Sequence, residues 1–109
     1  MIDRLNAARA YVEKRPTDKF GLYALAMELR RIEDWEACFT AFATLLGHYP
    51  DYGAAWYHLG ASRKEAGDRA GALAALREGL GACQRSGDSK TRAEIEALID
   101  GIEDEDPDA

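Results

Sequence analysis

The sequence repeats with a period of about 34 residues, and this period limits the possible folds more than any other feature of the chain. Residues 17–50 follow Pro16 and end at Pro50, and they can be laid over residues 51–84 without a gap. The positions that carry the same residue in both segments are Tyr23 and Tyr57, Leu25 and Leu59, Asp34 and Asp68, Ala41 and Ala75, Leu46 and Leu80, and Gly47 and Gly81. Such a period indicates one supersecondary unit that recurs and buries its apolar face on its neighbours.

Each repeat divides into two predicted helices. In the first repeat they span 18–31 and 35–48, and in the second 52–66 and 69–83. Asp34 and Asp68 stand just before the second helix of each pair, where a carboxylate accepts hydrogen bonds from free backbone N–H groups. Asp51 is predicted to cap the first helix of the second repeat in the same way, and Gly67 can adopt the left-handed conformation that ends a helix. The repeat is therefore a helix–turn–helix hairpin.

One further helix is predicted on each side of the two repeats, over 2–15 and 88–102. Apolar residues follow helical spacing in both, and polar residues occupy the other side. The apolar positions are Ile2, Leu5, Ala8 and Val12 in the first helix, and Ile95, Leu98, Ile99 and Ile102 in the last. We therefore predict an all-α chain of about six helices, with a single domain over 1–102.

Residues 103–109 contain five acidic side chains and no basic one. Most of the net charge of −6 belongs to this segment, so the rest of the chain is nearly neutral. We expect an acidic, disordered tail, because the segment has nothing apolar to bury.

The second repeat resembles the tetratricopeptide repeat through residues whose sizes alternate at fixed offsets. These are Trp56, Leu59, Gly60, Ala72, Leu76 and Leu80, and the first repeat is similar through Leu22, Leu25, Ala26, Cys38, Phe42 and Pro50. The resemblance implies a right-handed α-α superhelix of antiparallel helix hairpins. Arg63 departs from the pattern, because the family usually has an aromatic residue there. Gln84 stands where a proline would close the repeat.

The resemblance also implies a binding surface, since the first helix of each hairpin lines the concave face in this family. The predicted peptide- or partner-binding residues are Phe20, Tyr23, Met27 and Arg30 on the first such helix, and Tyr57, Ala61 and Lys64 on the second. The helix over 20–29 is apolar on nearly every side, so its second face should also be covered. The cover is a flanking helix of this chain, a partner segment or a second copy.

Arg30, Arg31 and Lys64 form a predicted basic rim beside these aromatic residues. It would suit a ligand with a carboxylate, although solvated surface charge explains it equally well. The acidic tail either keeps the chain soluble or folds over this rim and competes with the ligand. Chaperone-tail binding as known in one branch of the family is not expected, because Tyr23 and Met27 occupy the places of its carboxylate-binding residues.

The sequence gives no reason to expect catalysis. Cys38 and Cys83 lack a metal-binding spacing, and His48 and His58 have no obvious nucleophile beside them. We predict no catalytic residue, no metal and no cofactor, and no nucleic-acid partner because basic residues are not clustered. No apolar run is long enough to span a membrane and no secretory signal is visible, so we expect a cytoplasmic protein.

The predicted function is a protein–protein interaction module that binds a peptide or partner protein on the concave face of stacked hairpins. The first alternative is a structural module that acts through homo-oligomerisation. The second is a small enzyme or ligand-binding protein with an unrecognised site.

Overall fold

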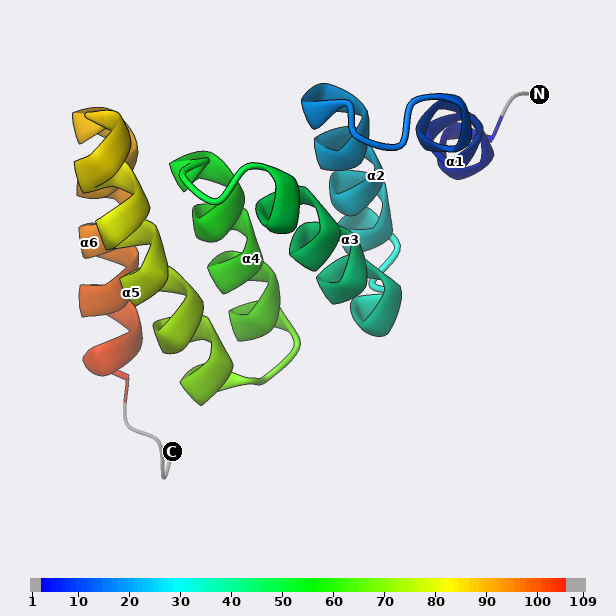
Figure 1. Ribbon diagram of the computed structural model, residues 1–109. Helices are drawn as coiled ribbons and strands as arrows, with labels where there is room; N and C mark the ends of the chain where they lie inside the picture. Colours follow the sequence, from blue (N-terminus) through cyan, green and yellow to red (C-terminus); the bar gives the residue numbers. More distant parts are fainter. Residues whose placement is uncertain (1–2, 106–109) are drawn as a thin grey trace. The chain divides into compact units, whose positions relative to one another are not determined.

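The computed structural model describes residues 3–105, which form six α-helices and contain no strand (Figure 1). The all-α prediction is confirmed. The helices are α1 (Arg4–Lys14), α2 (Lys19–Arg31), α3 (Trp35–His48), α4 (Gly53–Glu65), α5 (Arg69–Ser86) and α6 (Ser89–Glu103). The predicted helix bounds lie close to these, and the largest difference is at the end of α5.

Aspartate side chains cap most of the helices. Asp34 accepts a hydrogen bond from the backbone N–H of Ala37, and Asp68 accepts one from Gly71, as predicted. The expectation that Asp51 caps α4 is wrong, because the N-cap residue is Tyr52 and no side chain caps this helix. The Asp51 carboxylate instead forms an ion pair with Arg85 at 2.6 Å.

The turn between the two helices of each hairpin contains one residue with a positive φ. Gly67 has φ +86°, which confirms its predicted left-handed conformation. The corresponding residue of the first hairpin is Glu33, with φ +60°. A side chain in this region of backbone space costs energy that glycine avoids.

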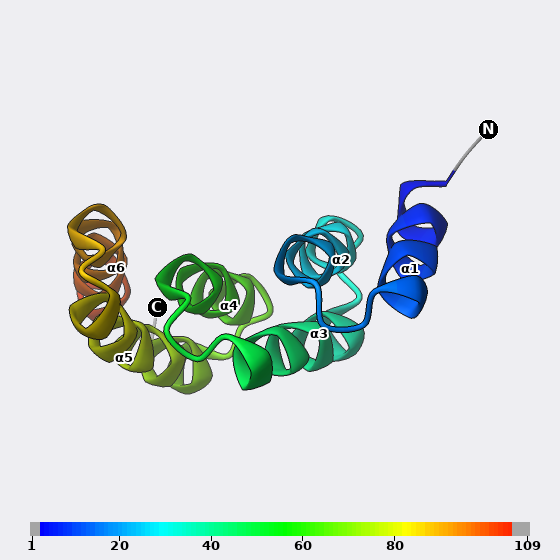
Figure 2. The ribbon, with the colours of Figure 1, turned by 45° about the horizontal axis from the view of Figure 1, so that its top comes forward.

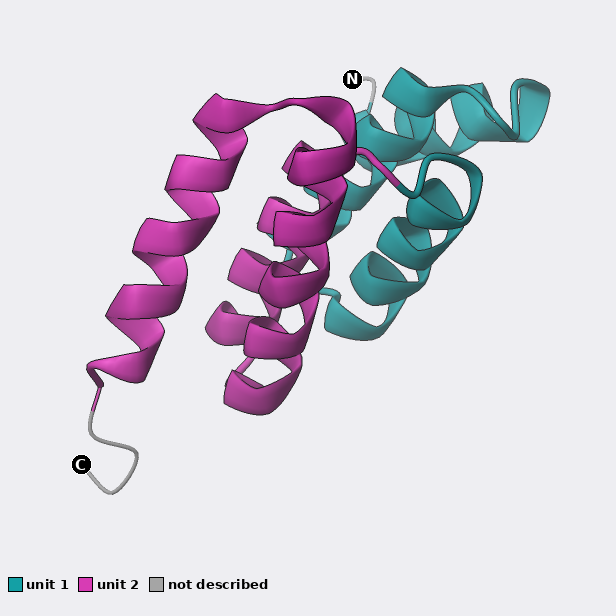
Figure 3. Ribbon diagram, turned by 60° about the vertical axis from the view of Figure 1, so that its left-hand side comes forward, with its two compact units in different colours: residues 1–50 teal, residues 51–109 magenta. Residues whose placement is uncertain are grey.

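The chain divides into two compact units (Figure 3). Unit 1 spans Met1–Pro50 and contains α1 to α3, and unit 2 spans Asp51–Ala109 and contains α4 to α6. The sequence predicted one domain over 1–102, and each unit holds one of the predicted repeats together with one flanking helix.

The core of unit 1 lies between α2 and α3, which run antiparallel. Small residues let the two helices approach closely: Ala26 and Cys38 are fully buried, and the Cys38 thiol lies 3.6 Å from the Ala26 carbonyl oxygen. Large residues fill the space around this contact, and all are almost completely buried. They are Leu22, Leu29, Phe42, Leu45 and Leu46.

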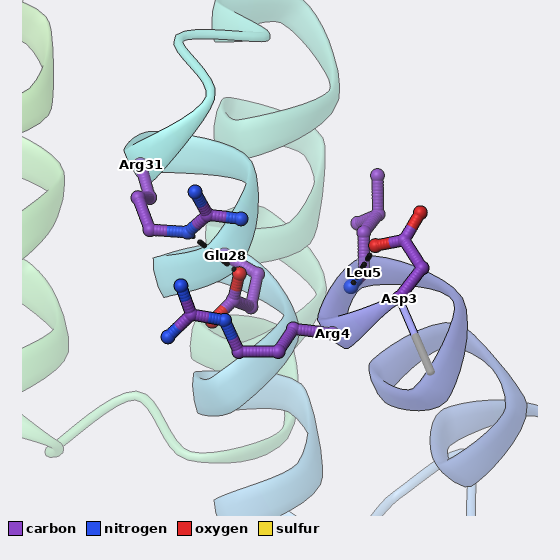
Figure 4. Close-up of polar contacts among 5 residues, drawn as sticks. All are labelled: Asp3, Arg4, Leu5, Glu28 and Arg31. Carbon is purple, nitrogen blue, oxygen red and sulfur yellow. Dashed lines mark hydrogen bonds and ion pairs between the residues drawn. The ribbon is translucent and has the colours of Figure 1, made fainter. Parts of the chain in front are cut away.

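Helix α1 packs beside α2 but buries none of its residues completely (Figure 2). The ring of Tyr11 lies directly against Gly21, where an added Cβ would come within 2.5 Å of it. Figure 4 shows Glu28 of α2 between two arginines, Arg4 of α1 at 3.8 Å and Arg31 at 2.9 Å. These two contacts join α1 to α2, together with the half-buried apolar side chains of α1, which are Leu5, Ala8 and Val12.

The core of unit 2 is shared by all three of its helices. Gly60 of α4 lies against Leu76 of α5, where an added Cβ would come within 2.5 Å of the leucine. The same core continues into α6, which buries Ile95, Ile99 and Ile102. Helix α6 thus packs on both helices of the hairpin, whereas α1 packs mainly against α2.

The acidic end of the chain begins inside a helix. Glu103 is the last residue of α6 and pairs with Arg77 at 3.5 Å. Glu105 forms an ion pair with Lys64 at 3.1 Å. The remaining part of the predicted disordered tail, 106–109, lies outside the described residues.

Candidate functional site

The four residues predicted to bind a partner on α2 lie on the side of that helix opposite its buried core residues. Phe20 is the most exposed large apolar side chain of the described residues, at 71%. Tyr23, Met27 and Arg30 follow at helical spacing and are half-buried. We call these four residues the α2 stripe. An apolar surface of this kind, beside a charged residue, is typical of protein interfaces.

The N-terminal end of the α2 stripe carries a cation between two aromatic rings. The Lys19 ammonium lies 5.8 Å from the ring centre of Phe20 and 6.0 Å from that of Tyr49. The Tyr49 hydroxyl donates a hydrogen bond to the Thr17 carbonyl, which fixes its ring beside the start of α2. Phe20 is therefore held against a positive charge and still presents most of its surface to solvent.

The predicted binding residues on α4 have a different environment. Tyr57 is half-buried and packs against the core that α5 and α6 share. Ala61 is half-buried, and Lys64 is exposed but paired with Glu105. Within unit 2, a flanking helix thus covers much of the α4 surface that the sequence left open.

The predicted basic rim is compensated by carboxylates of the same chain. Arg31 pairs with Glu28, and Lys64 pairs with Glu105. Arg30 is half-buried at the end of the α2 stripe. A ligand carboxylate would have to compete with these internal pairs.

Unit 1 also contains a groove that the sequence reasoning missed. It lies between α1 and α3, with α2 as its floor, and has a volume of about 430 Å³. Its apolar lining consists of Val12, Leu22, Leu25, Leu29, Ala37 and Ala41, and its polar lining of Arg9, Asp34, Glu36, Thr40 and Thr44. Unit 2 has a corresponding depression of about 390 Å³.

The two hollows use the same positions of the repeat. Every lining residue of the unit 2 depression lies one repeat after a lining residue of the unit 1 groove. The pairs are Leu22 and Trp56, Leu25 and Leu59, Leu29 and Arg63, Ala37 and Gly71, Thr40 and Ala74, Ala41 and Ala75, and Thr44 and Glu78. One feature of the sequence pointed to these positions. Arg63 departs from the family pattern, and it lines the unit 2 depression at the position that Leu29 occupies in the unit 1 groove.

The titratable groups with shifted pKa values have structural roles. Burial raises the pKa of the Cys83 thiol, and the nearby Asp88 carboxylate raises it further, so this cysteine is a poor nucleophile. Hydrogen bonds from Thr91 lower the pKa of Asp88, and one from Gly71 lowers that of Asp68. Within residues 3–105, no group of three or more histidine, cysteine or acidic side chains is placed to hold a metal ion.

None of the helices described here has both the length and the apolar composition that crossing a membrane requires.

Comparison with models of protein families gives no match. A search of curated proteins gives none either. Solved structures, however, match most of the chain. A Bordetella parapertussis protein solved in solution is 25% identical with a TM-score of 0.81, covering 94% of this chain and 89% of that protein.

A tetratricopeptide repeat domain protein from Salinibacter ruber is similar as well. Its solution structure is 25% identical with a TM-score of 0.77, covering 84% of this chain and 93% of that one. Its crystal structure gives 25% identity and a TM-score of 0.71, covering 80% and 98%. The repeated hairpins and these likenesses agree, so the chain has a tetratricopeptide-repeat-like fold, a helical repeat module of the kind typically used for protein interaction.

Proposed function

We propose that this protein is an interaction module that binds a peptide or partner protein on the first helix of each hairpin, α2 and α4. The α2 stripe is the main contact. The observation that carries the proposal is the 71% exposure of Phe20 on a helix whose opposite side is fully buried. Exposed aromatic and arginine side chains contribute much of the binding energy at protein interfaces. The similarity to a tetratricopeptide repeat domain protein supports the same class of function.

In this proposal the acidic end of the chain competes with an acidic ligand for Lys64. Glu105 already occupies the Lys64 ammonium at the far end of α4, so an acidic ligand would displace an internal carboxylate there. The α2 stripe does not need that displacement, because the ring of Phe20 is already exposed to solvent in the structure. We therefore assign the apolar anchors of the ligand to α2.

The test compares two surface variants of the full chain. Phe20→Ser removes the exposed ring from the α2 stripe, and Ile32→Ser removes an apolar side chain that is 44% exposed just beyond the end of the same helix. Partners captured from native cells by the unaltered chain should bind the Phe20 variant at least ~10-fold more weakly, as expected for loss of an interface anchor. Binding to the Ile32 variant should be unchanged.

Equal binding by both variants, with both folded by circular dichroism, would refute the assignment to the α2 stripe. Tyr57 is not suited to this test, because its ring packs against the core of unit 2 and its removal would destabilise the fold.

A further inference from the structure

The groove of unit 1 and the matching depression of unit 2 differ in charge, and one of the differences lies next to the aspartate that caps the second helix of each hairpin. In unit 2, the Arg63 guanidinium reaches the Asp68 carboxylate at 2.9 Å. In unit 1, Leu29 stands in place of Arg63, and Asp34 stands in place of Asp68. The first hairpin therefore has the acid of this pair without its arginine.

The acidic end of the groove is reinforced by a second carboxylate. Asp34 accepts the backbone N–H of Ala37 at 3.4 Å, and Glu36 is exposed in the first turn of α3. Among residues 3–105, no cation forms an ion pair with either carboxylate. Among the described residues that line the groove, Arg9 of α1 is the single cation, so carboxylates still outnumber cations there, and this favours a ligand that brings its own positive charge.

The rest of the groove is shaped for aliphatic side chains. Leu25 is half-buried on the floor, and the buried Leu22 and Leu29 lie on either side of it along α2. Val12 of α1 contributes to one wall, and Ala37 of α3 contributes to the other. A hollow of about 430 Å³ lies within the size range of ligand pockets. An apolar groove between two helices is the usual seat of an amphipathic helix.

We propose that this groove binds an amphipathic helical segment of a partner protein. Aliphatic side chains of the segment enter between α1 and α3, and an arginine or lysine of the segment pairs with Asp34 and Glu36. The bound cation takes the part that Arg63 plays inside unit 2. This site is separate from the α2 stripe, which uses other residues of the same helix, so either proposal can fail alone.

The first experiment titrates the full chain, labelled with ¹⁵N, with a synthetic helical peptide of about 15 residues. The peptide carries leucines at i, i+3 and i+7 and an arginine one turn further on, and a twin peptide has glutamate in place of the arginine. Amide signals of Leu25, Ala37 and Thr40 should shift, and the arginine peptide should bind about fivefold more tightly than its twin. The double variant Asp34→Asn, Glu36→Gln should lose this preference. Its caps should persist, because asparagine also caps helices.

The second experiment blocks the groove of unit 1 with a substitution. The same substitution at the matching position of unit 2 is the control. Thr40→Arg places a long cation on an exposed position of the groove wall, and Ala74→Arg places the same side chain on the corresponding exposed position of unit 2. The first variant should weaken peptide binding at least ~10-fold, since its side chain fills the groove and places a cation near the carboxylates that the peptide arginine would use. The second should bind as the unaltered chain does.

Three results would overturn the proposal. The first is the absence of any shift in the groove at millimolar peptide, and the second is a set of shifts confined to Phe20 and Tyr23. The third is a dimer in light scattering that Thr40→Arg dissociates, which would assign the groove to a second copy. If Thr40→Arg does not fold, the comparison of the two peptides on the Asp34, Glu36 double variant decides the question.

Discussion

At the scale of single residues, the two hairpins can be compared position by position, because the same backbone positions recur in each repeat. The turn of the second hairpin has Gly67 at φ +86°, and the turn of the first has Glu33 at φ +60°. Both turns thus use the same left-handed backbone conformation. Glycine adopts it readily in the second hairpin, whereas glutamate in the first hairpin does not. The first hairpin carries a strain that the second avoids.

Replacing Glu33 by glycine should therefore stabilise the protein. Relief of the left-handed side chain is worth about 1–2 kcal/mol, and the greater freedom of glycine in the unfolded chain offsets about half of that. We expect a net gain of roughly 0.5–1 kcal/mol, measured as a higher melting temperature. Gly67→Glu is the matched control and should lower the melting temperature. A lower melting temperature for Glu33→Gly would show that the glutamate side chain stabilises the turn.

Asp68 should contribute to stability in a pH-dependent way. Its pKa is lowered by the Gly71 backbone N–H and by the Arg63 guanidinium, so its contribution is complete above the pKa of an unfolded aspartate. The contribution is lost as the pH falls through the lowered value, because protonation removes the negative charge that strengthens these bonds and pairs with Arg63. Asp68→Ala should cost about 1 kcal/mol at pH 7 and progressively less as the pH falls below about 4.

Urea unfolding at neutral and acidic pH measures this difference directly. Asp34→Ala is the comparison variant, because Asp34 caps α3 through a longer bond of 3.4 Å and has no arginine at the position that matches Arg63. We expect it to cost less than Asp68→Ala at pH 7. An equal cost at neutral and acidic pH for Asp68→Ala would exclude an electrostatic role for this carboxylate.

At the scale of elements, the helices differ sharply in how well they are anchored. Helix α3 buries five residues, whereas α1 buries none and has only half-buried apolar side chains beside its Tyr11 and Arg4 contacts with α2. Regions with few buried apolar contacts open at low free energy. Backbone amides of α1 should therefore exchange with deuterium far sooner than those of α3, as measured by mass spectrometry. Exchange of α1 at the rate of α3 would mean that its contacts are stronger than their burial indicates.

The sequence predicted the elements well because their signals are local. Helical periodicity, Asp34 and Asp68 as caps, and Gly67 as a terminator are each visible within a few neighbouring residues. The end of α5 was placed too early, since Gln84 to Ser86 are polar yet helical and the helix ends at Gly87 with φ +74°. The apolar stripe of α1 was recognised, but the spacing of apolar residues does not state how deeply they are buried.

The candidate site was less accessible to prediction than the helices. Phe20 was selected from the family resemblance together with its helical spacing, and its side chain is 71% exposed. Tyr57 was placed on the same surface, although its packing depends on α6, which begins only at Ser89. The groove of unit 1 was missed because Leu29 and Asp34 each had an adequate explanation, as a core residue and a cap. Only the structure shows that both residues line the same groove.

At the scale of the whole molecule, the proposed function requires a chain that works as a single copy. Light scattering should give the mass of one chain from micromolar to near-millimolar concentration. A mass that rises with concentration would favour the alternative of a structural module that self-associates. In that case Phe20→Ser and Thr40→Arg would show which surface joins the copies, because only the variant at the true contact should restore the single-chain mass.

The shared positions of the two hollows have an evolutionary consequence. When a hairpin is duplicated, both copies begin with the same recognition chemistry at each of the shared positions. A later exchange at one shared position, leucine at 29 or arginine at 63, then changes the charge of one hollow and leaves the helices around it in place. Divergence of this kind lets the copies of one ancestral hairpin acquire different surface chemistry.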